Sequence, residues 1–348
     1  MRCLLYEERS VHLLLPPGMA LGWKKQCAVF LFYPIFLVSI FDKGEQGMKK
    51  SMMSFVCTAI LSSSLLFAGC SADTAQIGAP GGEQASGGST LEKAKQQGVV
   101  TVGFANEVPY AYATPDGKLT GEAVEVARVV LERMGIPEMN GVLTEFGSLI
   151  PGLKANRFDI ITAGMYITPK RAQEVAFANP EYSIGEAIAV KKGNPLNLKS
   201  YADIAANPAA KIAVMGGAIE IEYLEKSGVK KEQMVLVPDQ PSAVSALQSG
   251  RADAITMTGP SLQAVLDSAK DDSLERVMDF VQPEIDGKSV RGYGAAAFRK
   301  EDADFVAAYN AELQKLKESG ELLKILEPFG FTEQELPGEM TAEELVKE

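Results

Sequence analysis

Short apolar strands and amphipathic helices alternate along the chain from Thr90 onward. Residues 91–97 predict a helix, and the apolar run from Val99 to Phe104 predicts a strand. Apolar residues at helical spacing then mark one face of a further helix: Ala123, Val126, Ala127, Val130, Leu131 and Met134. Helices and strands that alternate in this way are typical of an α/β fold, which is our prediction.

One sequence pattern, L-x-x-x-R-x-D-x-I-T, occurs twice at a separation of 94 residues, beginning at Leu153 and at Leu247. Each copy predicts the end of a helix, a tight turn and a buried strand. Either the chain holds two lobes of similar build, or two helix-turn-strand units resemble each other by chance. Because ligands bind outside the carboxyl ends of strands in open α/β sheets, two lobes would place residues 163–166 and 257–260 across a cleft.

Two extended segments, near residues 187–192 and 293–298, are placed to carry the chain between the lobes. After the second segment, two helical faces are predicted to return to the first lobe: Phe305, Tyr309, Leu313 and Leu316, then Leu322, Leu323 and Leu326. The acidic end of the chain contains a capping box from Thr341 to Glu344, which predicts a short exposed helix.

Composition narrows the function by what is missing. The chain has 34 Lys and Arg against 45 Asp and Glu, and after Cys70 the balance is 27 against 41, which argues against nucleic acid as a partner. The histidine His12 and all four cysteines lie at or before position 70. The rest of the chain therefore lacks the side chains for Ser-His-Asp or Cys-His catalysis and for a His or Cys metal site. Carboxylate acid/base chemistry and an oxygen-ligand cation site stay open, although no calcium-loop spacing occurs.

The segment from Met48 to Cys70 has the basic, apolar and small-residue regions of a secretory signal. Ala68-Gly69-Cys70 resembles the lipobox of bacterial lipoproteins, although Phe67 stands where leucine is usual. The resemblance implies a signal peptide over 48–69, cleavage before Cys70 and a lipid on its sulfur. An unlipidated signal or a short membrane helix is the alternative.

The sequence also predicts the nature of the residues before and after this signal. Residues 1–47 fit no signal, and Lys43-Gly44-Glu45 requires purine-rich codons that resemble a ribosome-binding site shortly before Met48. We expect residues 1–47 to be untranslated, which N-terminal peptides from that region would refute. Residues 70–89 are rich in Gly, Ala and Ser and predict a flexible tether.

Residues 164–171, G-M-Y-I-T-P-K-R, resemble the signature of the amino-acid-type solute-binding proteins of ABC importers. The resemblance extends over about residues 91–331 and implies a two-lobed periplasmic-binding-protein-like fold of type II, with two chain crossovers. It implies a first lobe of residues 90–189 and 294–348, and a second of 190–293. Arg171 would hold a ligand carboxylate with Thr168 beside it, whereas the alternative is a surface arginine that starts a helix.

The same resemblance places further segments at the cleft. The positions that it implies for ligand contacts, besides Thr168 and Arg171, are Glu107, Tyr110, Phe146, Tyr166, Gly217, Ala218, Ile219 and Thr258. Free amides of a helix that starts after Gly217 would favour an anion. We expect Glu220 to be a helix-end charge rather than a ligand contact, and Glu222 and Glu225 to be solvated.

Two departures from the common amino-acid binders point to the ligand. Tyr166 and Thr258 stand where a threonine and an aspartate usually hold an α-ammonium group. The rings of Tyr110, Phe146 and Tyr166, expected to wall the end of the pocket opposite Arg171, suit a delocalised cation instead. A zwitterion with a carboxylate and a spread cation is therefore expected. Residues 103–127 and 163–182 resemble the ectoine/hydroxyectoine-binding lipoproteins of ABC importers, which implies that ligand class, with Glu107 accepting its N–H bonds.

The resemblance also implies the partners and location. It predicts a monomer outside the cytoplasm, anchored by lipid to the outer face of the membrane or periplasmic, that delivers its solute to an ABC permease without a cofactor or metal. Other ligands remain open, namely a polar amino acid, proline or glycine betaine. So do a dehydratase-type enzyme on the same fold and a sensor ectodomain.

Overall fold

The computed structural model describes residues 88–285 and 287–347. The predicted upstream region 1–47, the signal peptide 48–69 and Cys70 lie outside the described residues. In the described ranges, no helix combines the length and apolar character that crossing a membrane requires.

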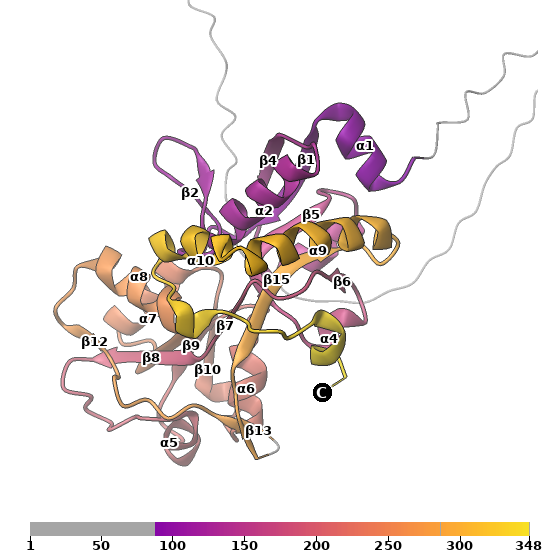
Figure 1. Cartoon of the computed structure of the whole chain (residues 1–348). Coiled ribbons are helices and arrows are strands. Elements are labelled where there is room, and N and C mark those ends of the chain that lie inside the picture. The colour runs from indigo at the N-terminus through magenta and orange to yellow at the C-terminus, as the bar shows by residue number, and fades with distance from the viewer. Residues whose placement is uncertain (1–87, 286, 348) are drawn as a thin grey trace, which may run out of the picture. The chain divides into compact units, whose positions relative to one another are not determined.

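A six-stranded sheet organises what we call the first lobe (Figure 1). Its order is β4 (Glu138–Leu143), β1 (Val99–Phe104), β5 (Ile160–Tyr166), β15 (Gly292–Phe298) and β6 (Ala176–Phe177), and β7 (Tyr182–Ile184) also pairs with β15. The strands β1, β4 and β5 are parallel, whereas β15 is antiparallel to β5. The loop after β1 carries a small hairpin, β2 (Tyr112–Ala113) with β3 (Leu119–Thr120).

Helices flank the sheet of the first lobe, and the longer ones bury apolar faces that the sequence predicts. They are α1 (Thr90–Gln97), α2 (Glu122–Arg133), α3 (Leu149–Lys154), α4 (Pro169–Ala172), α9 (Ala303–Glu318) and α10 (Glu321–Leu326). On α2 the predicted residues from Ala123 to Leu131 are buried, and Met134 is half-buried just after the helix. Each fully buried valine or leucine stabilises the fold by about 1.5–3 kcal/mol. The predicted face of α9 is buried as well, and on α10 Leu322 and Leu326 are buried while Leu323 is half-buried. Both helices pack on α2, which returns the chain to the first lobe.

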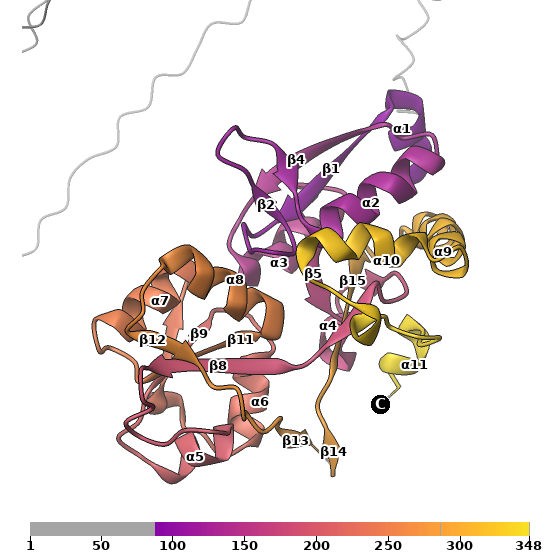
Figure 2. The ribbon, with the colours of Figure 1, turned by 60° about the vertical axis from the view of Figure 1, so that its left-hand side comes forward.

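A five-stranded sheet organises the second lobe (Figure 2). Its order is β10 (Met234–Val237), β9 (Ile212–Met215), β11 (Ala254–Thr258), β8 (Glu186–Lys191) and β12 (Leu274–Arg276). The strands β9, β10 and β11 are parallel, and β8 is antiparallel to both of its neighbours. The helices of this lobe are α5 (Tyr201–Ala206), α6 (Glu220–Lys226), α7 (Gln240–Gln248) and α8 (Gly259–Ala269).

The repeated sequence pattern corresponds to the same structural unit in each lobe. The first copy joins α3 to β5 and the second joins α7 to β11. Asp159 accepts a hydrogen bond from the backbone N–H of Thr101 at 3.1 Å, and Asp253 accepts one from Lys211 at 2.9 Å. The repeated aspartate thus ties the start of each central strand to its parallel neighbour, which explains why the pattern occurs twice.

The chain passes between the sheets twice, slightly earlier than the sequence predicts. It leaves β7 in the first sheet, passes Gly185, and enters β8 in the second sheet at Glu186. It returns between the end of β12 and the start of β15, through the short strands β13 (Glu284–Ile285) and β14 (Lys288–Ser289). The two predicted extended segments therefore lie inside β8 and β15, just after each crossing. The expected lobe limits stay a prediction.

The C-terminal helix differs from the exposed helix that the sequence predicts. The capping box forms as expected at the start of α11 (Ala342–Leu345). Leu345, however, is buried against the first lobe, and the backbone N–H of Ala342 donates to the side chain of Asn179 at 3.1 Å. Leu345 docks this short helix together with the partly buried Met340, Ala342 and Val346, which the charge-rich sequence obscures.

Candidate functional site

A cavity with a volume of ≈ 30 Å³ lies where the carboxyl ends of strands from both lobes meet. Of the predicted ligand contacts, those that line it are Glu107, Tyr110, Phe146, Tyr166, Arg171, Ala218, Ile219 and Thr258. The lining also includes Gly164, Met215, Glu220, Thr256 and Met257, which the predicted set does not contain. The cavity thus forms at the edge of both sheets where ligands bind in open α/β folds.

Arg171 is held at the cavity by the start of α4. The Thr168 hydroxyl caps this short helix by accepting from the Arg171 backbone N–H at 3.1 Å, and Pro169 follows as its first residue. Thr168 is a helix cap and does not line the cavity. The cap fixes the turn from which the Arg171 side chain extends towards the second lobe.

The Arg171 guanidinium bridges the two lobes. Its Nη1 donates to the Tyr166 carbonyl at 2.8 Å, and its Nη2 donates to the Gly217 carbonyl of the second lobe at 3.0 Å. Its Cζ lies 5.6 Å from the ring centroid of Phe146, within range of a cation–π contact. Gly217 thus contributes its carbonyl to this bridge and does not line the cavity. A guanidinium has five N–H donors, so several remain for a ligand.

The aromatic residues divide between two ends of the cavity. Tyr110 stacks on Tyr182 at 5.3 Å between centroids, and its hydroxyl is 2.6 Å from the Thr258 hydroxyl of the second lobe. The Tyr166 hydroxyl donates to the Ile184 carbonyl at 3.3 Å. Phe146, in contrast, lies beside Arg171, so it belongs to the guanidinium end. The expectation that all three rings wall the opposite end is wrong for Phe146.

Gly164 explains how Tyr110 reaches this position. Its φ is +58°, and a Cβ there would lie 2.6 Å from the Tyr110 ring. Any larger residue would both strain the backbone and displace the ring. The small residues Ala163-Gly164 can be recognised in the sequence. The sequence does not show which ring they accommodate, because Tyr110 lies 54 residues before Gly164.

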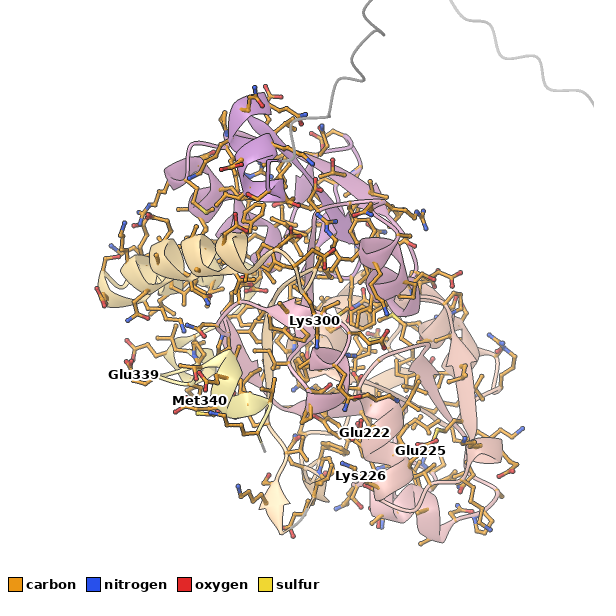
Figure 3. The ribbon with its side chains drawn as sticks, turned by 90° about the vertical axis from the view of Figure 1, so that its right-hand side faces the viewer. Glu222, Glu225, Lys226, Lys300, Glu339 and Met340 are labelled. Carbon is orange, nitrogen blue, oxygen red and sulfur yellow. The ribbon has the colours of Figure 1, made fainter. Side chains whose placement is uncertain are left out.

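Acidic side chains line the cavity together with the guanidinium. Glu107 is 8% exposed and Glu220 is 6% exposed, and Glu186, which is also buried, interacts electrostatically with both. Glu220 begins α6, as expected for a helix-end charge, but it is buried and lines the cavity. Glu222 and Glu225, on the outer face of α6, are solvated as expected, and Glu222 pairs with Lys226 at 2.8 Å (Figure 3).

Burial changes the protonation of these carboxyl groups. It raises the pKa of Glu107 to about 8, with a further contribution from Glu220, while the Ser261 hydroxyl and Arg171 act in the opposite direction. Burial also raises the pKa of Glu186 and of Glu220. A site with several buried carboxyl groups and one guanidinium favours protons or a cationic group.

Residues 88–285 and 287–347 contain no group of three or more His, Cys, Asp or Glu side chains arranged to hold a metal ion. The side chains that line the cavity suit recognition of a charged solute: a guanidinium for an anion, and carboxyl groups with aromatic rings for a cation.

Two lobes joined by two crossings, with a charged cavity between them, define a two-lobed binding protein of the periplasmic-binding-protein type II class. Residues 100–332 match the bacterial extracellular solute-binding proteins, family 3. This match covers more than half of the chain, and the chain belongs to that family.

The relatives make the class more specific. A probable amino-acid ABC transporter periplasmic-binding protein of Sinorhizobium fredii is 40% identical over 250 residues, which are 71% of this chain and 82% of the relative. The L-arginine-binding protein of Pseudomonas aeruginosa is 29% identical over 226 residues, 64% of this chain and 83% of the relative. The chain is thus an amino-acid-type solute-binding protein of an ABC transporter. It acts outside the cytoplasm on a small solute and works with a membrane permease.

Solved structures agree with this class. The crystal structure of EhuB in complex with hydroxyectoine is 39% identical with a TM-score of 0.68, and the match covers 74% of this chain and 97% of EhuB. The ancestral amino acid-binding protein AncCDT-1, a precursor of cyclohexadienyl dehydratase, is 26% identical with a TM-score of 0.60, covering 69% of this chain and 99% of that chain. The curated relatives named above are binding proteins and not enzymes.

Proposed function

We propose that this protein binds ectoine or hydroxyectoine in the cavity between its lobes and delivers it unchanged to an ABC permease. The observation that carries the proposal is that one guanidinium, of Arg171, and two carboxyl groups, of Glu107 and Glu220, line the same cavity. The likeness to the hydroxyectoine complex of EhuB supports the same ligand class.

The two ends of a cyclic amidinium carboxylate suit the charged groups of this cavity. Arg171 binds the carboxylate with the donors that do not bridge the lobes, and a paired guanidinium–carboxylate contact is strong and directional. Glu107 accepts the ring N–H groups, while Tyr110 and Tyr166 lie against the delocalised cation, each contact contributing about 0.5–2 kcal/mol. Glycine betaine has no N–H donor, so it would give the buried Glu107 no hydrogen bond beyond the one from Ser261.

Binding requires movement of the lobes. Ligand sites usually measure roughly 300–1,000 Å³, whereas the cavity described above measures ≈ 30 Å³. The solute therefore enters an opened cleft and meets the first-lobe residues Glu107, Tyr110, Tyr166 and Arg171. Closure then adds Thr258 and the start of α6, and this extra affinity favours the closed form.

A ligand with net positive charge is the second candidate. The carboxyl groups of Glu107 and Glu220 in the cavity wall, with that of Glu186 buried near them, outnumber the single guanidinium, which would suit arginine. Two arginine-binding proteins are 28–29% identical to this chain, which is why arginine is the cationic ligand that we consider. Burial raises the pKa of Glu107 to about 8, which favours the zwitterion, because a proton on Glu107 at neutral pH lowers the negative charge that a ligand has to balance.

The lipid anchor belongs to the same proposal. Cleavage before Cys70 and lipidation of its sulfur would keep the binding protein near its permease, with residues 70–89 as a tether. Mass spectrometry of the protein from membranes would detect the acylated cysteine. A free Cys70 thiol on the mature protein would contradict lipidation.

A thermal-shift panel of ectoine, hydroxyectoine, glycine betaine, proline, glutamine and arginine tests the ligand directly. A solute that binds the folded protein raises its Tm, and the stabilisation grows with the logarithm of the ratio of solute concentration to Kd. We expect the largest shifts with ectoine and hydroxyectoine. A larger shift with arginine would favour the second candidate, and conversion of any solute in one-dimensional NMR spectra would contradict a pure binding role.

A further inference from the structure

One side chain of the second lobe pairs with the backbone of the first lobe. Gln240 begins α7 and is 5% exposed. Its Oε1 accepts from the Val108 backbone N–H at 3.2 Å, and its Nε2 donates to the Val108 carbonyl at 3.0 Å. The side-chain amide thus satisfies both polar groups of one residue, much as a neighbouring strand would. Both bonds can exist only when the lobes are closed.

The same amide continues into the cavity wall. Gln240 Nε2 also donates to the hydroxyl of Ser261, a fully buried residue on α8. The Ser261 hydroxyl donates to Glu107 Oε1 at 3.0 Å. A hydroxyl has one proton and two acceptor positions, so it can accept from Gln240 and donate to Glu107 at once. The hydrogen bonds therefore run from Val108 through the second lobe and back to the carboxylate of Glu107.

Neither Gln240 nor Ser261 lines the cavity, so they act through Glu107 and Val108. We infer that Gln240 and Ser261 are positioning residues that form a latch: on closure they hold the lobes together and fix the Glu107 carboxylate, and thereby set the rate of solute release. The inference rests on the proposed closure around a solute, but not on the identity of that solute.

The latch predicts a kinetic signature. An open cleft lacks these bonds, so solute association should not depend on them, whereas release requires breaking them. Each hydrogen bond contributes about 0.5–1.5 kcal/mol, and 1.4 kcal/mol is a tenfold change. Loss of the Gln240 contacts should accelerate dissociation by about tenfold or more, with association changed by less than about threefold.

The test uses Gln240→Met in the full chain, because methionine keeps the side-chain length and the helix propensity but removes both polar atoms. The matched control is Gln248→Met at the last position of the same helix, where the exposed glutamine amide donates to Asp271. Stopped-flow or surface-plasmon-resonance rates are measured with hydroxyectoine. If another solute of the thermal-shift panel binds the wild type instead, the proposed ligand is wrong and that solute serves for the latch.

A readout by hydrogen exchange completes the test. In the solute-bound protein, exchange of the Val108 amide should be faster in Gln240→Met than in the wild type, while exchange of the Val102 amide in β1 stays the same. The same dissociation rate in Gln240→Met and the wild type would overturn the latch. So would an equal acceleration in Gln248→Met, or exchange at Val108 that Gln240→Met leaves unaltered in the solute-bound protein.

Discussion

Replacing Arg171 by methionine removes the guanidinium from the cavity and keeps a side chain of similar length. In the wild type that group donates to the Tyr166 carbonyl at 2.8 Å and to the Gly217 carbonyl at 3.0 Å, and it lies over the Phe146 ring. The variant therefore loses the proposed carboxylate partner and one contact that joins the lobes. The positive charge that lowers the pKa of Glu107 and Glu220 is lost as well.

The magnitude follows from the number of bonds. A paired contact with a carboxylate contains two charge-assisted hydrogen bonds of about 1.5–3 kcal/mol each. Their loss, about 3–6 kcal/mol, corresponds to a rise in Kd of about 10²- to 10⁴-fold. Starting from a Kd near micromolar, which is about −8 kcal/mol, binding should become too weak for calorimetry.

Isothermal titration calorimetry with ectoine and hydroxyectoine is the assay, and Lys170→Met is the matched control. Lys170 is the neighbouring basic residue on α4 and is exposed. The control should bind within about twofold of the wild type, because an exposed charge contributes little. If Arg171→Met keeps a Kd within about threefold of the wild type, Arg171 does not hold the carboxylate and the two-ended description of the site is wrong.

Two further predictions test the contact between the lobes and the buried acids. In Gly217→Ala, a Cβ at φ +83° would lie 2.5 Å from Gly147 Cα, so closure should be impeded and the Kd should rise about tenfold or more. In the control Gly216→Ala, the added Cβ meets no atom nearer than 3.8 Å, so this variant should bind like the wild type. Equal affinities of the two variants would contradict a close lobe contact. Burial raises the pKa of Glu181 from 4.5 to about 7, so the folded state binds a proton that the unfolded state releases, and stability should fall by at most about 3 kcal/mol as pH rises from 4.5 through 7. Urea unfolding at pH 5 and pH 7.5 measures this loss, and Glu181→Gln should weaken the pH dependence; an unchanged dependence in that variant would refute the assignment.

The local elements of the fold could be predicted because each has its own pattern. The apolar spacing of α2 identifies its buried face, and the repeated motif identifies the strand that ends at each side of the cleft. The signature around Arg171 identifies the side chain that reaches the cavity, although Thr168 turned out to be a helix cap.

What could not be predicted depends on how the lobes meet. Glu220 begins a charged helix, and only the approach of the first lobe turns it into a buried cavity residue. Phe146 lies beside Arg171 because both face the same turn of the second lobe, a contact that local spacing does not contain. Gln240 reads in sequence as an ordinary polar residue at a helix start, yet it pairs with Val108, 132 residues away. Such contacts between distant segments leave no periodic signal.

The central claim is that the cleft binds a zwitterionic solute by its carboxylate at one end and its delocalised cation at the other. The most direct test is a calorimetric titration of the wild type with hydroxyectoine. We predict one solute bound per chain with a Kd near micromolar, and recovery of the solute unchanged afterwards. Absence of heat with both ectoine and hydroxyectoine, together with saturable binding of arginine under the same conditions, would contradict it.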